Sequence, residues 1–337
     1  MSHQFVGDTK FLLPIRNIVL KYPSSVFLFS GIEGIGKRKL ASIICNNILH
    51  LNKSNLEIND NIFLYNESLY DKKSANLFKN NTHPDAFIIE NNDEKIIPIE
   101  ITRSLKKFLN STSGISKNKV VIIDTIDRMS LNSLNMLLKS LEEPPNGTFI
   151  FLISHNSSQI IKTVQSRLFK FNFKPLNQLD CLKVFSDIKI ENIKVEELKF
   201  LGTFFSYSPG LIIKYYNEHF IKNYENLIKF FIDIIQSKHN RNIFKFIPSE
   251  NKNNDEKLLI IFLEKILKLL FLNDANGQYF ENLSILEKKL LLHAEDSFLL
   301  SNLNEKYTKL QKDLFDAEKL NVNKNDLIDN FLTSFNF

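Results

Sequence analysis

The sequence predicts a parallel, doubly wound α/β domain followed by a purely helical region. Two observations lead to this fold class. In the first half of the 337-residue chain, short and continuous apolar runs alternate with helical patterns, as buried parallel strands and their connecting helices do. After Pro175 the strand patterns mostly stop, and amphipathic helical patterns continue along the rest of the chain. We therefore expect a layered α/β part first and an all-α part after it.

The strand candidates are separated by helices and loops in a regular order. A helix is predicted at 37–49, and further helical patterns lie near 98–110 and 131–142. The last of these ends at Pro144-Pro145, which cannot continue a helix. The polar residues 51–82 are predicted to form a poorly structured insertion. The strand candidates are VFLFS (26–30), AFIIE (86–90), KVVIID (119–124), TFIFLIS (148–154) and FKFNF (169–173), the last alternating as an edge strand does.

The helical region begins with short helices and a turn at 208–210. From about residue 220 the helices are longer, with loops predicted at 248–256 and 273–278. The longest apolar run, 258–272, contains three charged residues and is too short to span a bilayer. It therefore predicts a buried helix, and no membrane is implied.

Composition excludes several classes of protein. Hydrophobic residues make up 43% and charged residues 24%, which suits a soluble protein with sizeable cores. The net charge of +5 permits contact with nucleic acid but does not require it, because no long Lys/Arg run is present. Cys45 and Cys181 are too few for a disulfide scaffold and lack metal-site spacing. With no apolar signal core at the N-terminus, a cytoplasmic location is expected.

The first chemical motif is GIEGIGK, which follows a predicted strand and precedes a predicted helix. In that context successive backbone N–H groups around Gly31, Gly34 and Gly36 can cradle phosphates, and Lys37 would neutralise their charge. A working version has Ser or Thr next, to bind Mg²⁺, but Arg38 stands there and offers no oxygen. The alternative is a glycine turn that only lets strand and helix pack closely.

The second motif is the end of the strand at 119–124. Asp124 stands where this kind of fold presents a carboxylate near Mg²⁺. ATPases usually place Glu next to activate water, but Thr125 stands there and its hydroxyl is a poor base at neutral pH. Asp127 is predicted to be a helix cap or turn residue rather than a catalytic group. The metal ligand and the base are both replaced, which predicts a loop that no longer hydrolyses ATP.

Several segments carry a resemblance to a known family. The run LLKSLEEPP (137–145), a strand, and then TVQSR (163–167) resembles bacterial DNA polymerase III clamp-loader subunits, which are members of the pentameric AAA+ loaders. Among clamp-loader subunits, the sequence of these motifs is more similar to the delta-prime family than to the gamma/tau motor subunits. The segments that favour delta-prime are GIEGIGK, HPD (83–85), IDTIDRM (123–129) and the tail at 309–332.

The resemblance implies a domain division and a site in trans. The expected domains are an AAA+ nucleotide-binding-type domain at 1–174, a helical lid at 175–218 and a helical collar for oligomerisation at 219–337. Ser166 and Arg167 match the family's Ser-Arg-Cys motif, whose arginine meets ATP bound by the neighbouring subunit, while Leu168 replaces the cysteine. Arg167 is thus the expected arginine finger.

Three departures from the family pattern matter. No cysteine occurs at 50–82, where many members bind zinc with four, so no zinc is expected. Leu211 follows the turn at 206–210, where members often carry an arginine that senses nucleotide. At the strand end, the polar segment Ser154, His155 and Asn156 could touch a γ-phosphate, but a satisfied strand-end turn fits equally well.

The function implied is a non-hydrolysing stator subunit that donates a finger to a motor subunit while the sliding clamp is loaded onto primed DNA. Its expected partners are the gamma/tau and delta subunits, the beta clamp through the complex, and DNA through its backbone phosphates. No cofactor is required, no intrinsic ATPase is expected, and whether Lys37 still holds ATP or ADP stays open. The alternatives are an active AAA+ ATPase motor subunit and an AAA+ adaptor without a finger.

Overall fold

The computed structural model describes residues 6–50, 72–90, 96–155, 168–188, 195–217, 219–236, 252–271, 283–293, 297–320 and 325–334. The chain forms two compact units, Met1–Leu211 and Ile212–Phe337, and each is described on its own. The finer division into three domains stays a prediction.

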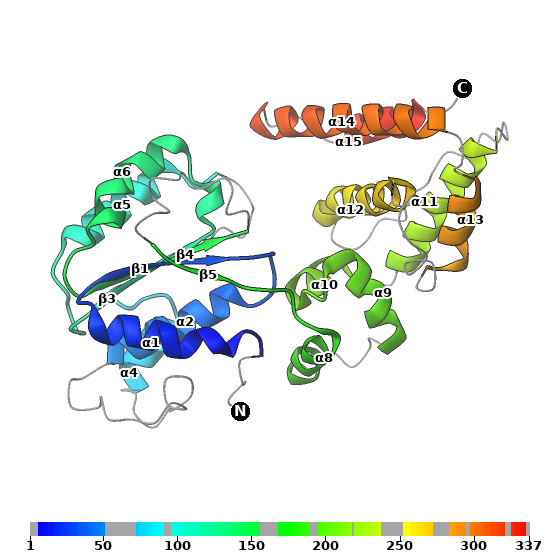
Figure 1. The fold of residues 1–337 in the computed structure, drawn as a ribbon. Coiled ribbons are helices and arrows are strands. Elements are labelled where there is room, and N and C mark those ends of the chain that lie inside the picture. Colours follow the sequence, from blue (N-terminus) through cyan, green and yellow to red (C-terminus); the bar gives the residue numbers. More distant parts are fainter. Residues whose placement is uncertain are drawn as a thin grey trace. The chain divides into compact units, whose positions relative to one another are not determined.

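The first unit is built on a five-stranded parallel sheet with strand order β2-β3-β4-β1-β5 (Figure 1). All five predicted strands are confirmed, and so is the α/β fold class. β5 pairs with β1 at one edge of the sheet, as its alternating sequence predicts. The strands are β1 (Ser25–Ser30), β2 (Ala86–Glu90), β3 (Lys119–Asp124), β4 (Thr148–Ser154) and β5 (Phe169–Asn172).

Helices cover both faces of the sheet (Figure 1). Helices α1 (Leu12–Lys21), α2 (Lys37–His50) and α4 (Lys72–Lys79) pack on one face. Helices α5 (Ile99–Asn110) and α6 (Leu131–Glu142) pack on the other. The sheet is therefore buried on both sides, which is why its central strands are continuous apolar runs.

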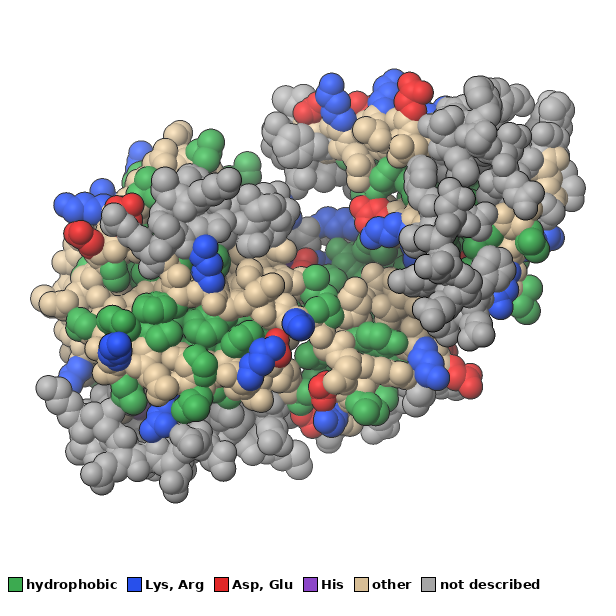
Figure 2. All heavy atoms as spheres, viewed as in Figure 1, with side chains coloured by type: hydrophobic (Ala, Val, Ile, Leu, Met, Phe, Trp, Pro, Cys, Tyr) green, Lys and Arg blue, Asp and Glu red, His purple; other side chains and the backbone are tan. Residues whose placement is uncertain are grey.

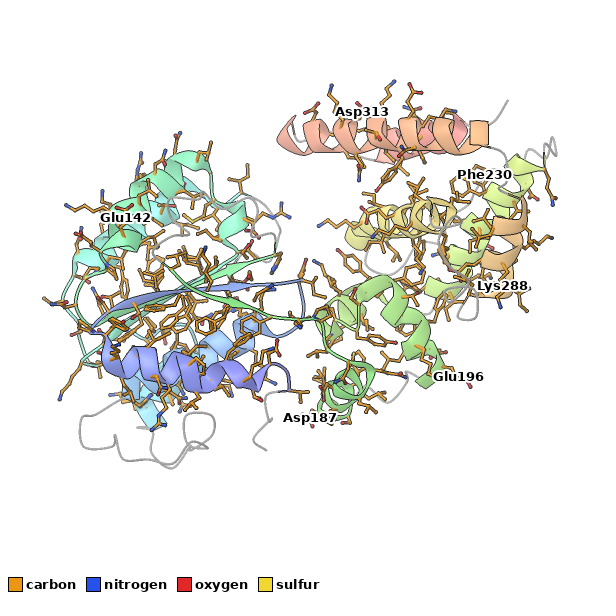
Figure 3. The ribbon with its side chains drawn as sticks, in the orientation of Figure 1. Glu142, Asp187, Glu196, Phe230, Lys288 and Asp313 are labelled. Carbon is orange, nitrogen blue, oxygen red and sulfur yellow. The ribbon has the colours of Figure 1, made fainter. Side chains whose placement is uncertain are left out.

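Alternate side chains of each strand feed the two cores, and side chains fill the space on both faces (Figure 3). Phe27 and Phe151, on neighbouring strands, stack with ring centroids 4.7 Å apart on the α1 and α2 side. Leu28 and Leu152 enter the opposite core beneath α5 and α6. Every residue of β1 and β4 is buried, so the carboxyl ends of these strands are held rigidly at one edge of the sheet.

The rest of the first unit consists of short helices. A 3₁₀ turn, η1 (Thr9–Phe11), precedes α1, and a second, η4 (Ile126–Arg128), follows β3. After β5 come α8 (Gln178–Asp187) and α9 (Val195–Phe205), and α10 (Pro209–Tyr215) spans the boundary with the second unit. The short helices predicted in this part of the chain are confirmed.

The described part of the second unit contains only helices. α11 packs against α13, and α14 lies beside α15 (Figure 1). The amphipathic pattern predicted for this region is confirmed in α14, because Tyr307, Leu310, Leu314 and Ala317 are buried along it. The helices are α11 (Phe220–Ile235), α12 (Lys252–Phe271), α13 (Ile285–His293), α14 (Ser297–Leu320) and α15 (Asn325–Thr333).

Three sequence predictions need correction. The predicted insertion is wrong for 72–79, which form α4 because Phe78 reaches the core beneath the sheet. The predicted loop at 248–256 is wrong from Lys252 on, where α12 begins. Pro209 starts α10 rather than lying inside a turn, since its fixed φ suits the first helical position. Residues 51–71 and the loop predicted at 273–278 lie outside the described residues.

Helix α12 confirms the buried helix predicted from the apolar run at 258–272. Phe262, Leu263 and Ile266 are almost completely inaccessible to solvent. In the described part of the chain, no helix is both long enough and apolar enough to cross a membrane.

Candidate phosphate-loop site

The glycine loop connects β1 to α2, as the sequence predicts. Gly34 and Gly36 adopt φ angles of +79° and +92°, in the left-handed region that side chains disfavour. α2 begins at Lys37, so the helix N-terminus with its unpaired N–H groups opens at the loop. The backbone thus has the shape that a phosphate-cradling loop requires.

The ammonium group of Lys37 is turned back onto the loop. Its Nζ donates hydrogen bonds to the carbonyl oxygens of Gly31 at 2.7 Å and Ile32 at 2.5 Å. The residue is only 3% exposed, and burial lowers the pKa of Lys37 to about 8, although the negative charge of Asp124 opposes the shift. Lys37 therefore already has hydrogen-bond partners within the protein, and its ammonium group is partly deprotonated near pH 8.

Arg38 bridges the carboxyl ends of two neighbouring strands. Its Nη2 is hydrogen-bonded to Glu90 Oε1, and its Nη1 lies 3.8 Å from Asp124 Oδ2. Glu90 and Asp124 are register partners on β2 and β3. The guanidinium therefore provides a tethered positive charge between two carboxylates at the position from which a metal would be held.

Asp124 itself lies in a mixed environment. Burial raises the pKa of its carboxyl group, and the nearby charges of Arg38 and Lys37 oppose that rise. The next residue, Thr125, is buried and supplies a hydroxyl rather than a carboxylate. The strand end therefore has one paired acid and, at the following position, no base able to activate water.

Asp127 lies in the 3₁₀ turn η4, as the turn interpretation predicts, and its carboxylate also contacts the end of β4. Its Oδ1 accepts a hydrogen bond from Ser154 Oγ at 2.7 Å, and its Oδ2 accepts one from His155 N at 2.5 Å. The helix cap of α6 is Ser130 instead, which accepts from Ser133 N. Asp127 thus ties η4 to the end of β4, a contact that local spacing in the sequence does not reveal.

The same contacts decide between the two interpretations of the polar strand end. Ser154 is fully buried and its hydroxyl is committed to Asp127, which favours the satisfied strand-end turn for this residue. The pKa of His155 is lowered by burial and by the positive charge of Lys37, so its ring is neutral at physiological pH. Asn156 lies outside the described residues.

The turn that precedes α10 also reaches the loop. Ser208 Oγ donates to Glu33 O at 2.6 Å, and Gly210 N donates to Gly34 O at 3.0 Å. Leu211 follows with an apolar side chain where a charged sensor was the family expectation. The glycine loop is therefore contacted directly by residues about 175 positions further along the chain.

The predicted finger cannot be placed, because Ser166 and Arg167 lie outside the described residues. The next residue, Leu168, is buried and leads into β5. Arg167 as a finger stays a prediction.

The HPD segment makes structural contacts. His83 Nδ1 accepts a hydrogen bond from Asp85 N at 3.0 Å, so its proton lies on Nε2, which contacts Ser74 Oγ at 2.9 Å. Both side chains are buried, and the pair joins α4 to the start of β2. Within the described ranges, no cluster of three or more His, Cys, Asp or Glu is suited to hold a metal ion.

Charge on the visible surface of the first unit is dispersed. Figure 2 shows Lys and Arg side chains lying singly among neutral and acidic ones rather than in one patch.

A parallel sheet with a glycine loop between β1 and α2, and an acid at the end of β3, defines a P-loop type of nucleotide-binding domain. Comparison with known proteins narrows this class. Residues 16–177 match the family described as "DNA polymerase III, delta subunit". Over that part of its length, the chain is similar to the AAA+ clamp-loader family that contains the delta-prime and gamma subunits of DNA polymerase III.

The similar proteins differ in the share of this chain, and of their own length, over which they match. DNA polymerase III subunit delta' of Pseudomonas aeruginosa is 40% identical over 28% of this chain and 29% of its own length. The delta' subunit of Buchnera aphidicola subsp. Baizongia pistaciae is 27% identical over 58% of each chain. The gamma subunit of the same organism is 24% identical over 94% of this chain and 88% of its own. The chain thus spans less than two thirds of the first two relatives.

One solved structure matches nearly the whole chain at low similarity. A DNA polymerase III gamma subunit-related protein from Thermotoga maritima is 18% identical, with a TM-score of 0.41, and the match covers 96% of this chain and 98% of that one. That likeness is too low to inform function.

Proposed function

We propose that this chain is a non-hydrolysing stator subunit of the DNA polymerase III clamp loader, which donates Arg167 to the ATP site of a neighbouring motor subunit. The observation that carries the first half of the proposal is the pairing of Arg38 with both Glu90 and Asp124. A hard divalent cation needs oxygen ligands that carry uncompensated negative charge. Here the guanidinium of Arg38 pairs with the carboxylates of Glu90 and Asp124 and compensates their charge. Hydrolysis within this subunit is therefore disfavoured at its first step.

Two further features support the proposal that this subunit does not hydrolyse ATP. Lys37 is held by loop carbonyls, so binding a phosphate would require it to break both bonds and regain its full charge. Thr125 follows Asp124 and cannot act as a general base at neutral pH. The role needs no cofactor or zinc of its own, and any ATP or ADP held by the loop would stay unhydrolysed.

The second half rests on the family resemblance around Arg167. A planar guanidinium that is always charged suits transfer of a γ-phosphate, and such a finger is typically worth about 10³–10⁵ in rate for small GTPases. The partners proposed are the gamma/tau and delta subunits, the beta clamp through the assembled complex, and primed DNA through its phosphates. The place of action is the cytoplasm.

The test is the steady-state ATPase of the reconstituted loader, stimulated by clamp and primed DNA. Arg167→Ala is expected to lower the rate while the complex still assembles. Arg103→Ala, which removes an exposed arginine on α5, is the matched control and is expected to leave the rate unchanged. An unchanged rate for Arg167→Ala in the assembled loader would remove the finger from the proposal.

The two alternatives give different results in the same system. An active motor subunit would turn over Mg·ATP as an isolated chain, and Lys37→Ala would abolish that activity. An adaptor without a finger would assemble normally, and its complex would hydrolyse ATP equally well with Arg167→Ala.

A further inference from the structure

The turn before α10 and the glycine loop are joined by two hydrogen bonds from one short segment. Ser208 is fully buried, and its hydroxyl donates to the carbonyl oxygen of Glu33 at 2.6 Å. Two residues on, the amide of Gly210 donates to the carbonyl oxygen of Gly34 at 3.0 Å. Both acceptors are adjacent loop carbonyls, so the two segments are joined at consecutive residues.

Two glycines allow this approach. A Cβ atom on Gly34 would lie 2.4 Å from Ser208 Oγ and 2.7 Å from Leu211 N. A Cβ atom on Gly210 would lie 2.7 Å from Gly34 Cα and 3.0 Å from Gly34 O. Neither position has room for a side chain, since these distances are below those seen for real Cβ contacts. The two backbones therefore touch directly.

The segment that makes these bonds is itself anchored. Ser206 and Tyr207 both adopt left-handed backbone angles, with φ of +48° and +52°, which non-glycine residues rarely do. The Tyr207 ring lies over Gly202 on α9, where a Cβ atom would be 2.3 Å from the ring. Ser208 N donates to Phe205 O at the end of the same helix. The turn is thus braced against α9 on one side and hydrogen-bonded to the loop on the other.

We propose that Ser208 and Gly210 form a latch that fixes the helices after β5 onto the glycine loop without nucleotide. In a site where ATP bridges such a loop and a following helical segment, the arrangement depends on what is bound. Here the protein's own hydrogen bonds make the bridge, and Leu211 brings no charge that would respond to a phosphate. The latch accounts for how this part of the chain remains in one arrangement while motor subunits cycle.

This inference deepens the stator proposal and rests on it for its meaning in the loader, but it is tested separately. Hydrogen–deuterium exchange of the isolated full chain reports directly on the amide of Gly210 and on the amides of the loop. The arginine-finger role is measured only by the ATPase rate of the assembled loader. The finger proposal and the latch proposal can therefore fail independently of each other.

The decisive variant is Gly210→Ala. The change is favourable for helix α10 in isolation, but the added Cβ atom meets the backbone of Gly34 and must push the two segments apart. Exchange in peptides covering 31–38 and 205–215 is expected to rise by about fivefold, the factor that corresponds to one net hydrogen bond. Gly114→Ala is the control, because its Cβ atom would meet nothing closer than 3.6 Å.

The milder variant Ser208→Ala removes one hydrogen bond without a clash and is expected to raise exchange in the same two peptides. It also covers the case in which Gly210→Ala does not fold. The latch is overturned if neither variant changes exchange in these peptides. It is also overturned if ATP or ADP slows exchange of 205–211 in the wild-type chain, since nucleotide would then be making the bridge.

Discussion

Two buried lysines in the α/β unit make similar hydrogen bonds but have different structural roles. Lys119 and Lys37 are 5% and 3% exposed, and each ammonium group is hydrogen-bonded to backbone carbonyls. Lys119 Nζ donates to the carbonyl oxygens of Phe108 and Leu109 in the last turn of α5 and of Ser111, which caps that helix. Lys37 donates to two carbonyls of the glycine loop. A motif lysine here makes the contacts of a structural lysine.

The difference lies in what each lysine satisfies. Lys119 supplies donors to the C-terminal end of a helix, where carbonyls have no partner within the helix and the dipole favours a cation. Lys37 lies at the start of α2, where the dipole disfavours a cation and the two carbonyls belong to a turn. Lys119 is therefore expected to contribute more to stability, although both lysines have a pKa lowered by burial.

The largest expected effect is that of Lys119→Met. It removes three hydrogen bonds that a buried, charged donor makes at the end of α5, which costs about 2–4 kcal/mol of unfolding free energy. Urea denaturation at pH 7 measures the loss. Lys106→Met, an exposed lysine on the same helix, is the control and should change stability by no more than about 0.5 kcal/mol. Equal losses for both variants would contradict the capping role.

The second prediction concerns Lys37→Met, which should cost about 1 kcal/mol at pH 7, since two loop hydrogen bonds are lost while a buried charge is removed. The cost should also depend on pH. The pKa of Lys37 is about 8 in the folded chain and 10.5 for an unperturbed lysine, so the unfolded state binds more protons between these values. The contribution of Lys37 to wild-type stability therefore rises with pH from about 8 to 10.5.

Lys37→Met lacks that group, so the stability difference between wild type and variant should widen over the same pH window. Paired urea titrations at pH 7.5 and pH 10 measure the change, and the subtraction removes the contribution of other groups. A difference that stays constant would mean that Lys37 is not held in a low-pKa environment.

The third prediction is that Arg38→Ser costs less, on the order of 0.5 kcal/mol, because the guanidinium is about one third exposed and its ion pairs are partly screened. The serine also returns an oxygen at the position where P-loop proteins bind Mg²⁺. Thermal unfolding measures the stability, and Mg·ATP turnover by the isolated chain is expected to stay at background, since Thr125 still supplies no base. Turnover in the variant would show that Arg38 alone blocks hydrolysis.

Sequence patterns predicted the sheet well and the loop's partners poorly, for a physical reason. Buried strands and amphipathic helices are determined by the pattern of apolar residues over a short stretch of sequence. All five strands, and helices such as α6, were therefore placed to within one or two residues. The bond from Ser208 to Glu33 spans 175 positions, and that from Ser154 to Asp127 spans 27. No local spacing encodes such pairs, and Lys119 carried no motif at all.

The smallest expected effect is also the sharpest for function. Lys37→Met in the reconstituted loader should leave the clamp- and DNA-stimulated ATPase unchanged, because this lysine serves its own loop and not a phosphate that is transferred. The same substitution at the corresponding lysine of a motor subunit removes the charge that meets the β- and γ-phosphates and should abolish that site's turnover. Comparing the two variants in one preparation controls for assembly. A loss of rate from Lys37→Met with the complex intact would place this loop among the working ATP sites, and the likeness between Lys37 and Lys119 would then be limited to their hydrogen bonds.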